Sequence, residues 1–506
     1  MVRVDRIIFW LFAGTTLLVP LVFVPQLTDG YELPKAAVFR TLVLTILGLM
    51  FFRKKVERPK FDKIFGWLLA GFLMSFVLST LFSLSPHISF WGSYERQQGL
   101  LTVLFYFLFF GAFVSFFRKK EQLLELVKWM CYSAFIVSVA ALVQAFEVVR
   151  IYGTIGQPNF LGVYLMMMVP FIFLLKPRYW KIILAVVLVA LAFTMSRSAF
   201  VGLFAGSVFY AFSSGKKKII IVHGLLVLAV ILLNVFGSEV KDNVVLSRFV
   251  IGSTAYESAE IRMQIWPEVL GKIFERPLLG KGPEMIGEGF DHSKFEEEVD
   301  RAHNEILDTA GTLGIVGLMI YLALLVKIFI MGWRERRELL AQAAIISMIG
   351  LFFANMFSFS VTVHYVFWWI CLGILVVLSG QKYVKVELFK GFRYLALFGF
   401  LAVIFTINVR PMVADYFYQR GIEKMIVLNH FQASEDFRRA SEWNPNEVQY
   451  LYRGAEHLVL VAEDYEGAVR KKIIERGEKL FLEKARGIVG NLEKVKELEK
   501  RFTSIE

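Results

Sequence analysis

Apolar runs long enough to cross a lipid bilayer recur along this chain, and they constrain its fold more than any other feature. Since about 20 helical residues span the hydrocarbon core, we expect about thirteen spans, near 7–27, 36–52, 64–84, 99–117, 122–147, 159–176, 181–196, 198–213, 218–236, 312–333, 340–360, 362–380 and 394–409. The composition agrees, because 57% of the residues are hydrophobic and the mean hydropathy is +0.57. A soluble core cannot absorb this apolar content. The sequence therefore predicts an all-α, polytopic transmembrane helical bundle.

Basic clusters occupy alternate connections between these runs. They are RKKVERPK (53–60), RKK (118–120), KPRYWK (176–181), GKKK (215–218), WRERR (333–337) and KYVKVELFKGFR (382–393). Cytoplasmic loops of membrane proteins are enriched in Lys and Arg, so we expect these connections and the N-terminus on the cytoplasmic side of the inner membrane. Topology then accounts for the formal net charge of +12, and no nucleic-acid partner is expected.

An odd number of spans places the other connections and the C-terminus outside the cytoplasm. These connections are 28–35, 85–98, 148–158 and the long loop 237–311. The expected organisation is N-terminal transmembrane helices in 1–236, an extracytoplasmic loop carrying active-site residues in 237–311, C-terminal transmembrane helices in 312–410 and an extracytoplasmic helical domain in 411–506.

The segment after Pro411 is charged and helical in pattern, and part of it resembles a tetratricopeptide repeat. With Pro445 at the last position of a 34-residue unit, the packing positions fall on Phe417, Gly421, Ala433, Phe437 and Ala440. A second, degraded copy is expected at about 448–482, followed by a polar capping helix. A generic helical tail is the alternative. Such repeats hold peptides or partner proteins, so the domain could recruit an acceptor or an assembly partner.

The stretch RAHNEILDTAGTLGIVG (301–317) joins a polar segment to an apolar run. As a helix, it would align His303, Leu307, Ala310, Gly314 and Gly317 along one stripe. Small residues on such a stripe allow a neighbouring membrane helix to approach closely. The positive end of the helix dipole would keep His303 neutral, and a neutral histidine can act as a base. A histidine that only caps or hydrogen-bonds at the interface is the alternative.

Isolated cations accompany His303 on the same predicted side of the membrane. Arg197 lies between two spans, Arg262 lies on an amphipathic stretch of the long loop, and Lys35, Arg40, Arg96 and Arg301 are secondary candidates together with Asn304. Guanidinium groups fork onto phosphate oxygens without requiring a metal, so this set suits a diphosphate. Arg40 and Arg96 could instead snorkel at the interface, and Arg197 could be structural.

No cofactor or metal site is predicted. The acidic run FEEEVD (295–300) lacks a mixed His/Asp pattern and is expected to be a solvated loop face. Cys131 and Cys371 lie within apolar runs, where they are expected to pack.

Several of these segments together resemble the O-antigen ligase and O-antigen polymerase family, which includes bacterial O-linked oligosaccharyltransferases. The matching segments are HN with two following glycines (His303, Asn304, Gly314, Gly317), GQPNFLG (156–162), TMSRSA (194–199) and RxxIW followed by PLLGKG (262–282). These segments occur in the order that the family shows. The resemblance covers about residues 1–410. The resemblance implies a GT-C-like, metal-independent, inverting glycosyltransferase that takes a glycan from undecaprenyl diphosphate. It further implies that Arg197 and Arg262 hold the diphosphate and that His303 assists the acceptor hydroxyl.

The resemblance leaves the acceptor open, because members of the family act as ligases, polymerases or protein O-glycosyltransferases. The expected repeat domain is not part of the minimal ligase pattern. Two further classes remain as alternatives: a transporter or flippase of lipid-linked sugars, and a non-catalytic scaffold of a polysaccharide export complex. The expected spans are nearly free of central charge, which is unlike an ion-coupled transporter, and a scaffold would leave the His–Arg set unexplained.

Overall fold

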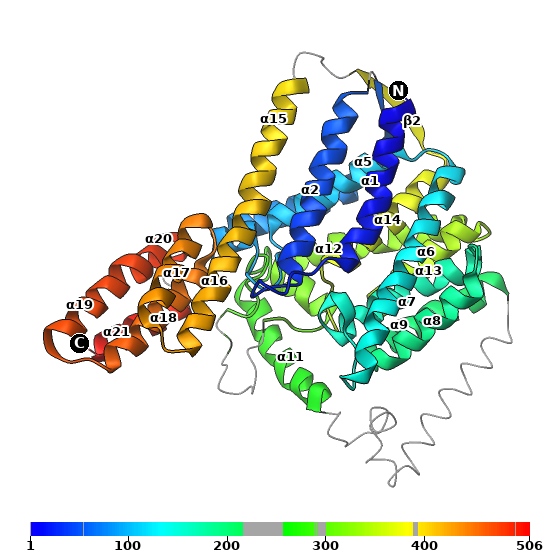
Figure 1. Ribbon diagram of the computed structural model, residues 1–506. Helices are drawn as coiled ribbons and strands as arrows, with labels where there is room; N and C mark the ends of the chain where they lie inside the picture. The colour runs from blue at the N-terminus through cyan, green and yellow to red at the C-terminus, as the bar shows by residue number, and fades with distance from the viewer. Residues whose placement is uncertain are drawn as a thin grey trace, which may run out of the picture.

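Helices make up nearly all of the regular structure of this protein. The computed structural model describes residues 2–53, 55–215, 257–288, 290, 300–387, 393–490 and 492–505. A large helical bundle carries a smaller helical unit at one side (Figure 1). The predicted all-α fold class is confirmed, with the addition of one short two-stranded ribbon.

Every expected span except 218–236, which lies outside the described residues, coincides with a helix. The bundle helices are α1 (Val2–Leu21), α2 (Glu32–Phe51), α3 (Lys63–Leu81), α5 (Leu100–Phe116), α6 (Lys120–Val143), α7 (Pro158–Leu175), α8 (Trp180–Thr194), α9 (Arg197–Ser214), α12 (Glu305–Arg334), α13 (Leu339–Ala354), α14 (Thr362–Leu378) and α15 (Arg393–Ile404). Among the described residues, seven helical stretches are long and apolar enough to cross a membrane. The chain is therefore a multi-pass membrane protein.

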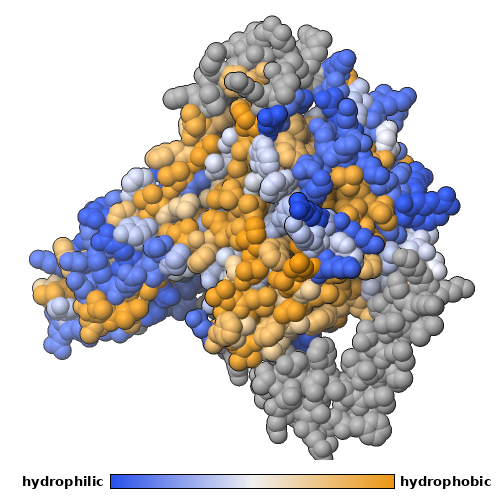
Figure 2. Space-filling view, turned by 45° about the vertical axis from the view of Figure 1, so that its right-hand side comes forward, coloured by the Kyte–Doolittle hydropathy of each residue, from blue (hydrophilic) through white to orange (hydrophobic). Residues whose placement is uncertain are grey.

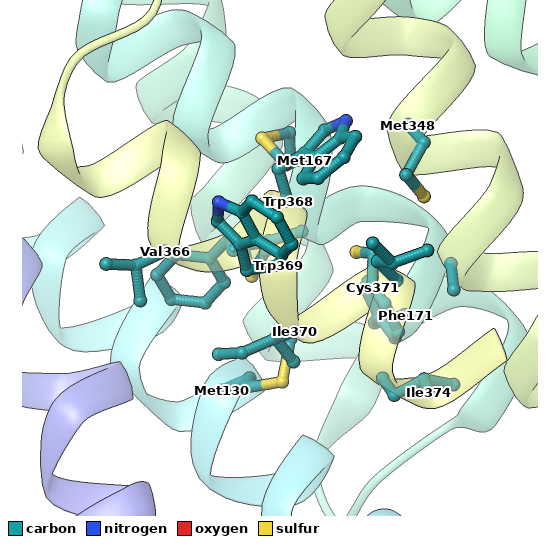
Figure 3. Packing of buried hydrophobic residues seen from close by; sticks show 14 of the residues in the cluster. Met130, Met167, Phe171, Met348, Val366, Trp368, Trp369, Ile370, Cys371 and Ile374 are labelled. Atoms are coloured by element: carbon teal, nitrogen blue, oxygen red, sulfur yellow. The ribbon is translucent and has the colours of Figure 1, made fainter. Parts of the chain in front are cut away.

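Helix α14 forms the centre of the bundle. Nearly all of its side chains are buried, including both Trp368 and Trp369. A helix that is apolar and buried on all sides belongs to the interior of a bundle. Figure 3 shows side chains of α6, α7 and α13, among them Met130, Phe171 and Met348, packed around it. Cys371 lies buried in this core and Cys131 in the same cluster, so their predicted packing role is confirmed.

Many large apolar side chains on the outside of the bundle remain exposed. Trp67 is 78% exposed, and Ile64, Leu81 and Phe212 are each more than half exposed. Apolar residues cover much of the centre and lower part of the bundle in Figure 2, whereas the smaller unit at the left carries many hydrophilic residues. Because a soluble protein rarely exposes so much contiguous apolar surface, this surface is the part of the molecule that faces lipid.

Four of the basic connections meet at one end of the bundle. Strand β1 (Lys55–Lys60) pairs antiparallel with β2 (Lys382–Glu387). Arg118 forms an ion pair with Glu57 beside this ribbon, and Lys120 forms one with Glu338, 2.8 Å from Nζ to Oε1. The connections at 53–60, 118–120, 333–338 and 382–387 therefore lie on one side, as a common cytoplasmic location requires.

The smaller helical unit packs against connections at the opposite end. It consists of α16 (Arg410–Ile426), α17 (His430–Trp443), α18 (Val448–Glu463), α19 (Gly467–Gly477), α20 (Glu483–Val489) and α21 (Glu493–Ile505). Tyr94, in the α4–α5 connection, donates a hydrogen bond to Asp415 (2.6 Å), and the backbone N–H of Asp29 donates to the same carboxylate (3.2 Å). His87 of α4 (Pro86–Trp91) contacts the carbonyl of Asn446 (2.7 Å). The 22–31 and 85–98 connections thus share a side with this unit.

Residues expected to pack in a repeat do so within this unit. Ala433, Phe437 and Ala440 are fully buried, and a Cβ at Gly421 would lie only 2.5 Å from the Phe437 ring. Helix α16 continues from α15 through the π-helical segment Phe405–Val409, so the expected boundary at 410/411 falls inside one helical path. The identification of these helices as tetratricopeptide repeats stays a prediction.

The orientation in the membrane can be tested with reporter fusions. A reporter that is active only outside the cytoplasm should be active after residue 464 and inactive after residues 120 and 336. This follows because the basic connections share one end of the bundle and the C-terminal unit packs at the other. Activity after 120 or 336 would contradict the orientation.

Candidate active site

Helix α12 begins just after His303, not at it. Asn304 is the N-cap residue, and its Oδ1 accepts hydrogen bonds from the backbone N–H groups of Ile306 (3.1 Å) and Leu307 (3.2 Å). His303 precedes this cap in a left-handed backbone conformation, with φ of 52°. The expectation that His303 occupies the first helical turn is therefore wrong. The capping turn, rather than a helical stripe, sets the direction of the imidazole.

The small residues of α12 are expected to admit a neighbouring membrane helix, but the helix is interrupted among them. At Gly314 the backbone is non-helical, with φ of 71° and ψ of −179°. The loop 277–282 enters this break: Lys281 N donates to Gly311 O (2.8 Å), Gly282 N to Thr312 O (3.2 Å), and Ile315 N to Pro277 O (2.7 Å). The predicted uninterrupted helix over 303–317 is wrong. Gly311 and Gly314 lie against the segment that contains Leu278 and Ile286, whereas Gly317 lies against Leu313 of its own helix.

The ring of Phe359 organises the charged side chains around His303. The ring centroids of His303 and Phe359 are 5.0 Å apart. The guanidinium carbons of Arg96 and Arg301 lie 4.6 Å and 5.4 Å from the same Phe359 centroid. Since an aromatic face attracts a cation, Phe359 holds both guanidinium groups beside the imidazole. Phe359 was not among the predicted site residues.

Each of these two arginines has a carboxylate partner. Arg96 Nε lies 2.7 Å from Asp300 Oδ2, and Arg301 forms an ion pair with Glu284, which also accepts a hydrogen bond from Ser93. Arg96 therefore does not snorkel. Asp300 is the one described member of the 295–300 run, and its side chain stays 41% exposed while it pairs with Arg96. Nearby arginines lower the pKa of the Asp300 carboxyl against the opposing effect of burial, so Asp300 stays ionised.

Arg197 and Arg262 come from different elements and act on one another electrostatically. Arg197 is the first residue of α9, after the N-cap Ser196, and Arg262 lies on α11 (Glu257–Glu275). Burial and the charge of Arg197 both lower the pKa of Arg262. Among the described residues, the Arg262 Nε has no hydrogen-bond partner. Two neighbouring guanidinium groups with an open N–H are suited to an anion.

His303 is neutral in this environment. Burial is the largest cause that lowers the pKa of its imidazole to about 4, followed by the positive charge of Arg262. Arg96 and Arg301 act in the same direction, whereas Asp300 opposes them. The structure thus brings His303, Arg262, Arg96 and Arg301 into one electrostatic cluster, with Arg197 beside Arg262.

The other two predicted cations belong to a neighbouring polar layer. Arg40 is buried and donates hydrogen bonds to Thr102 and to the carbonyl of Gln97, so it ties α2 to the start of α5 and does not snorkel. Lys35 Nζ donates to the Tyr31 carbonyl (3.1 Å). Glu32 interacts electrostatically with both Lys35 and Arg96. In the described part of the chain, neither Lys35 nor Arg40 contacts His303.

A cavity of about 130 Å³ is lined in part by Arg301 and Phe359, which also belong to the cluster around His303. Its lining includes the polar side chains Glu284, Glu305, Asp308 and Asn355, which sequence reasoning missed. Only their place beside the HN motif could have drawn attention to Glu305 and Asp308. Within the described ranges, no group of three or more His, Cys, Asp and Glu side chains is placed to hold a metal ion.

The chain is similar to known proteins over the region that carries this site. Residues 182–322, which include Arg197, Arg262, His303 and Asn304, match the family model described as O-antigen ligase. Proteins named "Putative polysaccharide ligase" from Rickettsia conorii and Rickettsia felis are 24% and 25% identical to it over 226 residues. The alignments cover 42% of this chain and 53% and 54% of those relatives, so the chain spans about half their length. The predicted resemblance to the O-antigen ligase and polymerase family is confirmed.

The break in α12 can be tested by substituting its glycine. A Cβ at Gly314 would lie 2.2 Å from the Leu278 carbonyl oxygen, at a positive φ that favours glycine. Gly314→Ala should therefore destabilise the protein by about 1–3 kcal/mol and lower its unfolding temperature in detergent. Gly111→Ala is the control, because Gly111 lies within α5 with no atom within 4 Å of a new Cβ. Equal unfolding temperatures for both variants would contradict the loop-pairing account.

Proposed function

We propose that this membrane protein, whose residues 182–322 match the O-antigen ligase family, transfers a glycan from undecaprenyl diphosphate to an acceptor hydroxyl. The reaction would take place at the extracytoplasmic face during surface polysaccharide biosynthesis. The observation that carries the proposal is a neutral His303 held beside Arg262, Arg96 and Arg301. A neutral imidazole among guanidinium groups combines a proton acceptor with an anion site.

The donor diphosphate is proposed to bind between Arg197 and Arg262. Burial and, after it, the charge of Arg197 lower the pKa of Arg262. A bound anion would offset this like charge and accept from the Arg262 Nε–H, which has no partner among the described residues. Arg96 and Arg301 are paired with Asp300 and Glu284 and are proposed to shape the site around the imidazole. The lipid tail would extend along the apolar outer surface of the bundle.

His303 is proposed as the general base for the acceptor. The acceptor oxygen attacks the anomeric carbon, and the bond from that carbon to the diphosphate oxygen breaks with its electron pair leaving on the diphosphate. The acceptor proton passes to the imidazole, which later releases it to solvent. Attack from the side opposite the leaving group inverts the anomeric centre. Arg197 and Arg262 stabilise the charge that accumulates on the leaving diphosphate.

Donor binding would also make His303 a stronger base. Part of the depression of its pKa comes from positive charge, chiefly that of Arg262. A diphosphate adds negative charge at that position, and a nearby anion raises the pKa of a histidine. The imidazole would then accept a proton more readily in the donor complex than in the free protein, which favours proton transfer only when the donor is present.

The acceptor remains open between a lipid-linked chain, a lipid core and a protein hydroxyl. The C-terminal helical unit packs on the 85–98 connection, which carries Arg96, so it stands close enough to present an acceptor or a partner protein. Glycan analysis of cells with and without this protein would decide the product. In cells that lack the protein, shortening of the glycan to single repeat units indicates a polymerase, and accumulation of polymer on the lipid carrier indicates a ligase.

Replacement of the proposed diphosphate arginines tests the donor site. Arg197→Ala and Arg262→Ala should each lower transfer by about 10- to 100-fold, since a charge-assisted hydrogen bond contributes ~1.5–3 kcal/mol. Lysine at either position should restore only part of the rate, because it lacks the bidentate fork. Arg178→Ala, in a connecting loop beside Tyr179, is the matched control. Normal transfer by both alanine variants would exclude the diphosphate role.

Replacement of His303 tests the base. His303→Ala should reduce turnover ~10²–10⁴-fold while binding of farnesyl diphosphate, a soluble donor mimic, is retained. If His303 only hydrogen-bonds, His303→Gln would keep near-parental turnover, and this result would exclude the base.

The pH dependence gives an independent readout of the same group. Protonation inactivates the base, so activity should fall as pH decreases through the pKa of His303. That pKa is about 4 in the free protein and should be higher in the donor complex. The acid limb of kcat should therefore lie at higher pH than the acid limb of kcat/KM, and both limbs should vanish in His303→Gln. Coincident limbs would show that the donor does not tune the histidine.

A further inference from the structure

The cavity beside Arg301 is lined by polar and by aromatic side chains. The polar lining includes Glu284, Arg301, Glu305, Asp308 and Asn355, from the loop after α11, the start of α12 and the end of α13. Aromatic side chains of α3, α5 and α14 line the remainder, among them Phe72, Phe107, Tyr365, Trp368 and Trp369. Phe359 belongs to this lining and also contacts His303. We call this space the acidic chamber.

Buried hydrogen-bond acceptors in the acidic chamber lack donors. Asn355 is 3% exposed, and its Nδ2 donates to Glu305 Oε2 (2.9 Å) and Ser360 Oγ (2.8 Å). The carboxylate partner fixes the orientation of the amide, so the unpartnered atom is the Oδ1 acceptor. Asp308 Oδ1 accepts from Ala302 N (2.8 Å), while its Oδ2 has no partner among the described residues. Because a buried polar atom is costly to leave unpaired, the chamber calls for a ligand that donates hydrogen bonds.

The charge of the acidic chamber argues against a phosphate. Among the described lining residues, the one guanidinium is that of Arg301, which is paired with Glu284. Glu305 and Asp308 add two more carboxyl groups, so this described lining carries no surplus positive charge. A phosphate would find acceptor oxygens where it needs donors. Hydroxyl groups, in contrast, donate to such oxygens without adding charge.

The aromatic walls fit the apolar face of a sugar or the first part of a lipid chain. Trp368 and Trp369 follow one another on α14, with ring centroids 4.9 Å apart in an edge-to-face arrangement (Figure 3). Both indoles line the chamber. Phe107 packs against Trp369, with their ring centroids 4.8 Å apart. Aromatic rings bury large apolar areas while their polar edges remain able to bond.

We propose that the acidic chamber binds the uncharged, hydroxyl-bearing head of a glycolipid. The unpaired acceptors of Asp308 and Asn355 receive its hydroxyl hydrogens, and the α14 and α5 rings hold its apolar part. If the proposed function holds, on which this assignment rests, the ligand is the acceptor. The two substrates are then separated by charge, with the diphosphate beside Arg197 and Arg262 and the acceptor beside Asp308. Phe359 lines the chamber and contacts the imidazole, so the chamber adjoins the proposed base.

Binding of a small alkyl glycoside tests the chamber without any catalysis. The full-length protein in amphipol, titrated by calorimetry with n-octyl β-glucoside below its micelle concentration, should bind it, and n-octyl phosphate should bind at least 5-fold more weakly. Asp308→Asn keeps the Oδ1 that pairs with Ala302 and replaces the open acceptor by an NH₂ group. It should weaken glucoside binding by about 5-fold, the effect of one hydrogen bond. Asp464→Asn, on the C-terminal unit at the end of α18, should leave the affinity unchanged.

A second variant covers the case in which Asp308→Asn fails to fold. Val103→Phe adds volume to a chamber wall and should abolish glucoside binding while the unfolding temperature stays near the parental value. Equal affinities for the two octyl ligands, or unaltered glucoside binding in folded Asp308→Asn or Val103→Phe, would overturn the proposal.

Kinetics separate the chamber from the proposed transfer reaction. In a transfer assay, Asp308→Asn should raise the KM of the acceptor while farnesyl diphosphate binding is unchanged. Loss of farnesyl diphosphate binding instead would contradict the acceptor assignment. If the parental protein binds octyl glucoside as described but transfers no glycan, the proposed function fails and the chamber stands. If it transfers glycan but does not bind the glucoside, the chamber fails alone.

Discussion

The backbone pairing between the loop 277–282 and the break in α12 is the interaction on which the site depends. A membrane helix that loses its regular hydrogen bonds must satisfy the freed groups within the protein, because hydrocarbon offers no partner. Here the loop supplies that partner at Gly311, Thr312 and Ile315. The residues directly after this loop bring Glu284 to Arg301, and the carbonyls of Lys281 and Pro283 accept hydrogen bonds from Ser83 and Ser89 of the α3–α4 region. One unwound turn thus joins the membrane helices to the charged residues above them.

The charges around His303 fall into two groups with different roles. Arg96 and Arg301 are neutralised by carboxylates and held on the Phe359 ring, which makes them fixed parts of the scaffold. Burial and the charge of Arg197 lower the pKa of Arg262, and an anion bound beside Arg262 would offset that like charge. In the proposed reaction, the first group orients the site and the second stabilises the departing diphosphate.

The position of the C-terminal unit gives this arrangement a further consequence. Asp415 of α16 accepts hydrogen bonds from Tyr94 and from the backbone of Asp29, so the unit is anchored to two connections of the membrane bundle. The Tyr94 connection also carries Arg96, the residue paired with Asp300. A partner bound to the unit would therefore lie near a connection in which Tyr94, which contacts the unit, is close in sequence to Arg96 of the proposed catalytic cluster.

The sequence by itself determined the membrane helices, the grouping of basic connections and the motifs that contain Arg197, Arg262 and His303. Apolar runs and Lys/Arg clusters report local solvation, which does not depend on the tertiary fold. Only the tertiary structure decided that His303 precedes the helix, that Gly314 breaks it, and that Phe359, Glu284 and Asp308 surround the site. The sequence 303–317 alone is compatible with a continuous helix, and the alternative is favoured because a loop more than twenty residues upstream supplies its hydrogen bonds. Arg40 and Arg96 both appear in the sequence as isolated cations. In the structure, Arg40 joins α2 to the start of α5, whereas Arg96 belongs to the cluster around His303, because the partners of a side chain come from distant segments of the chain.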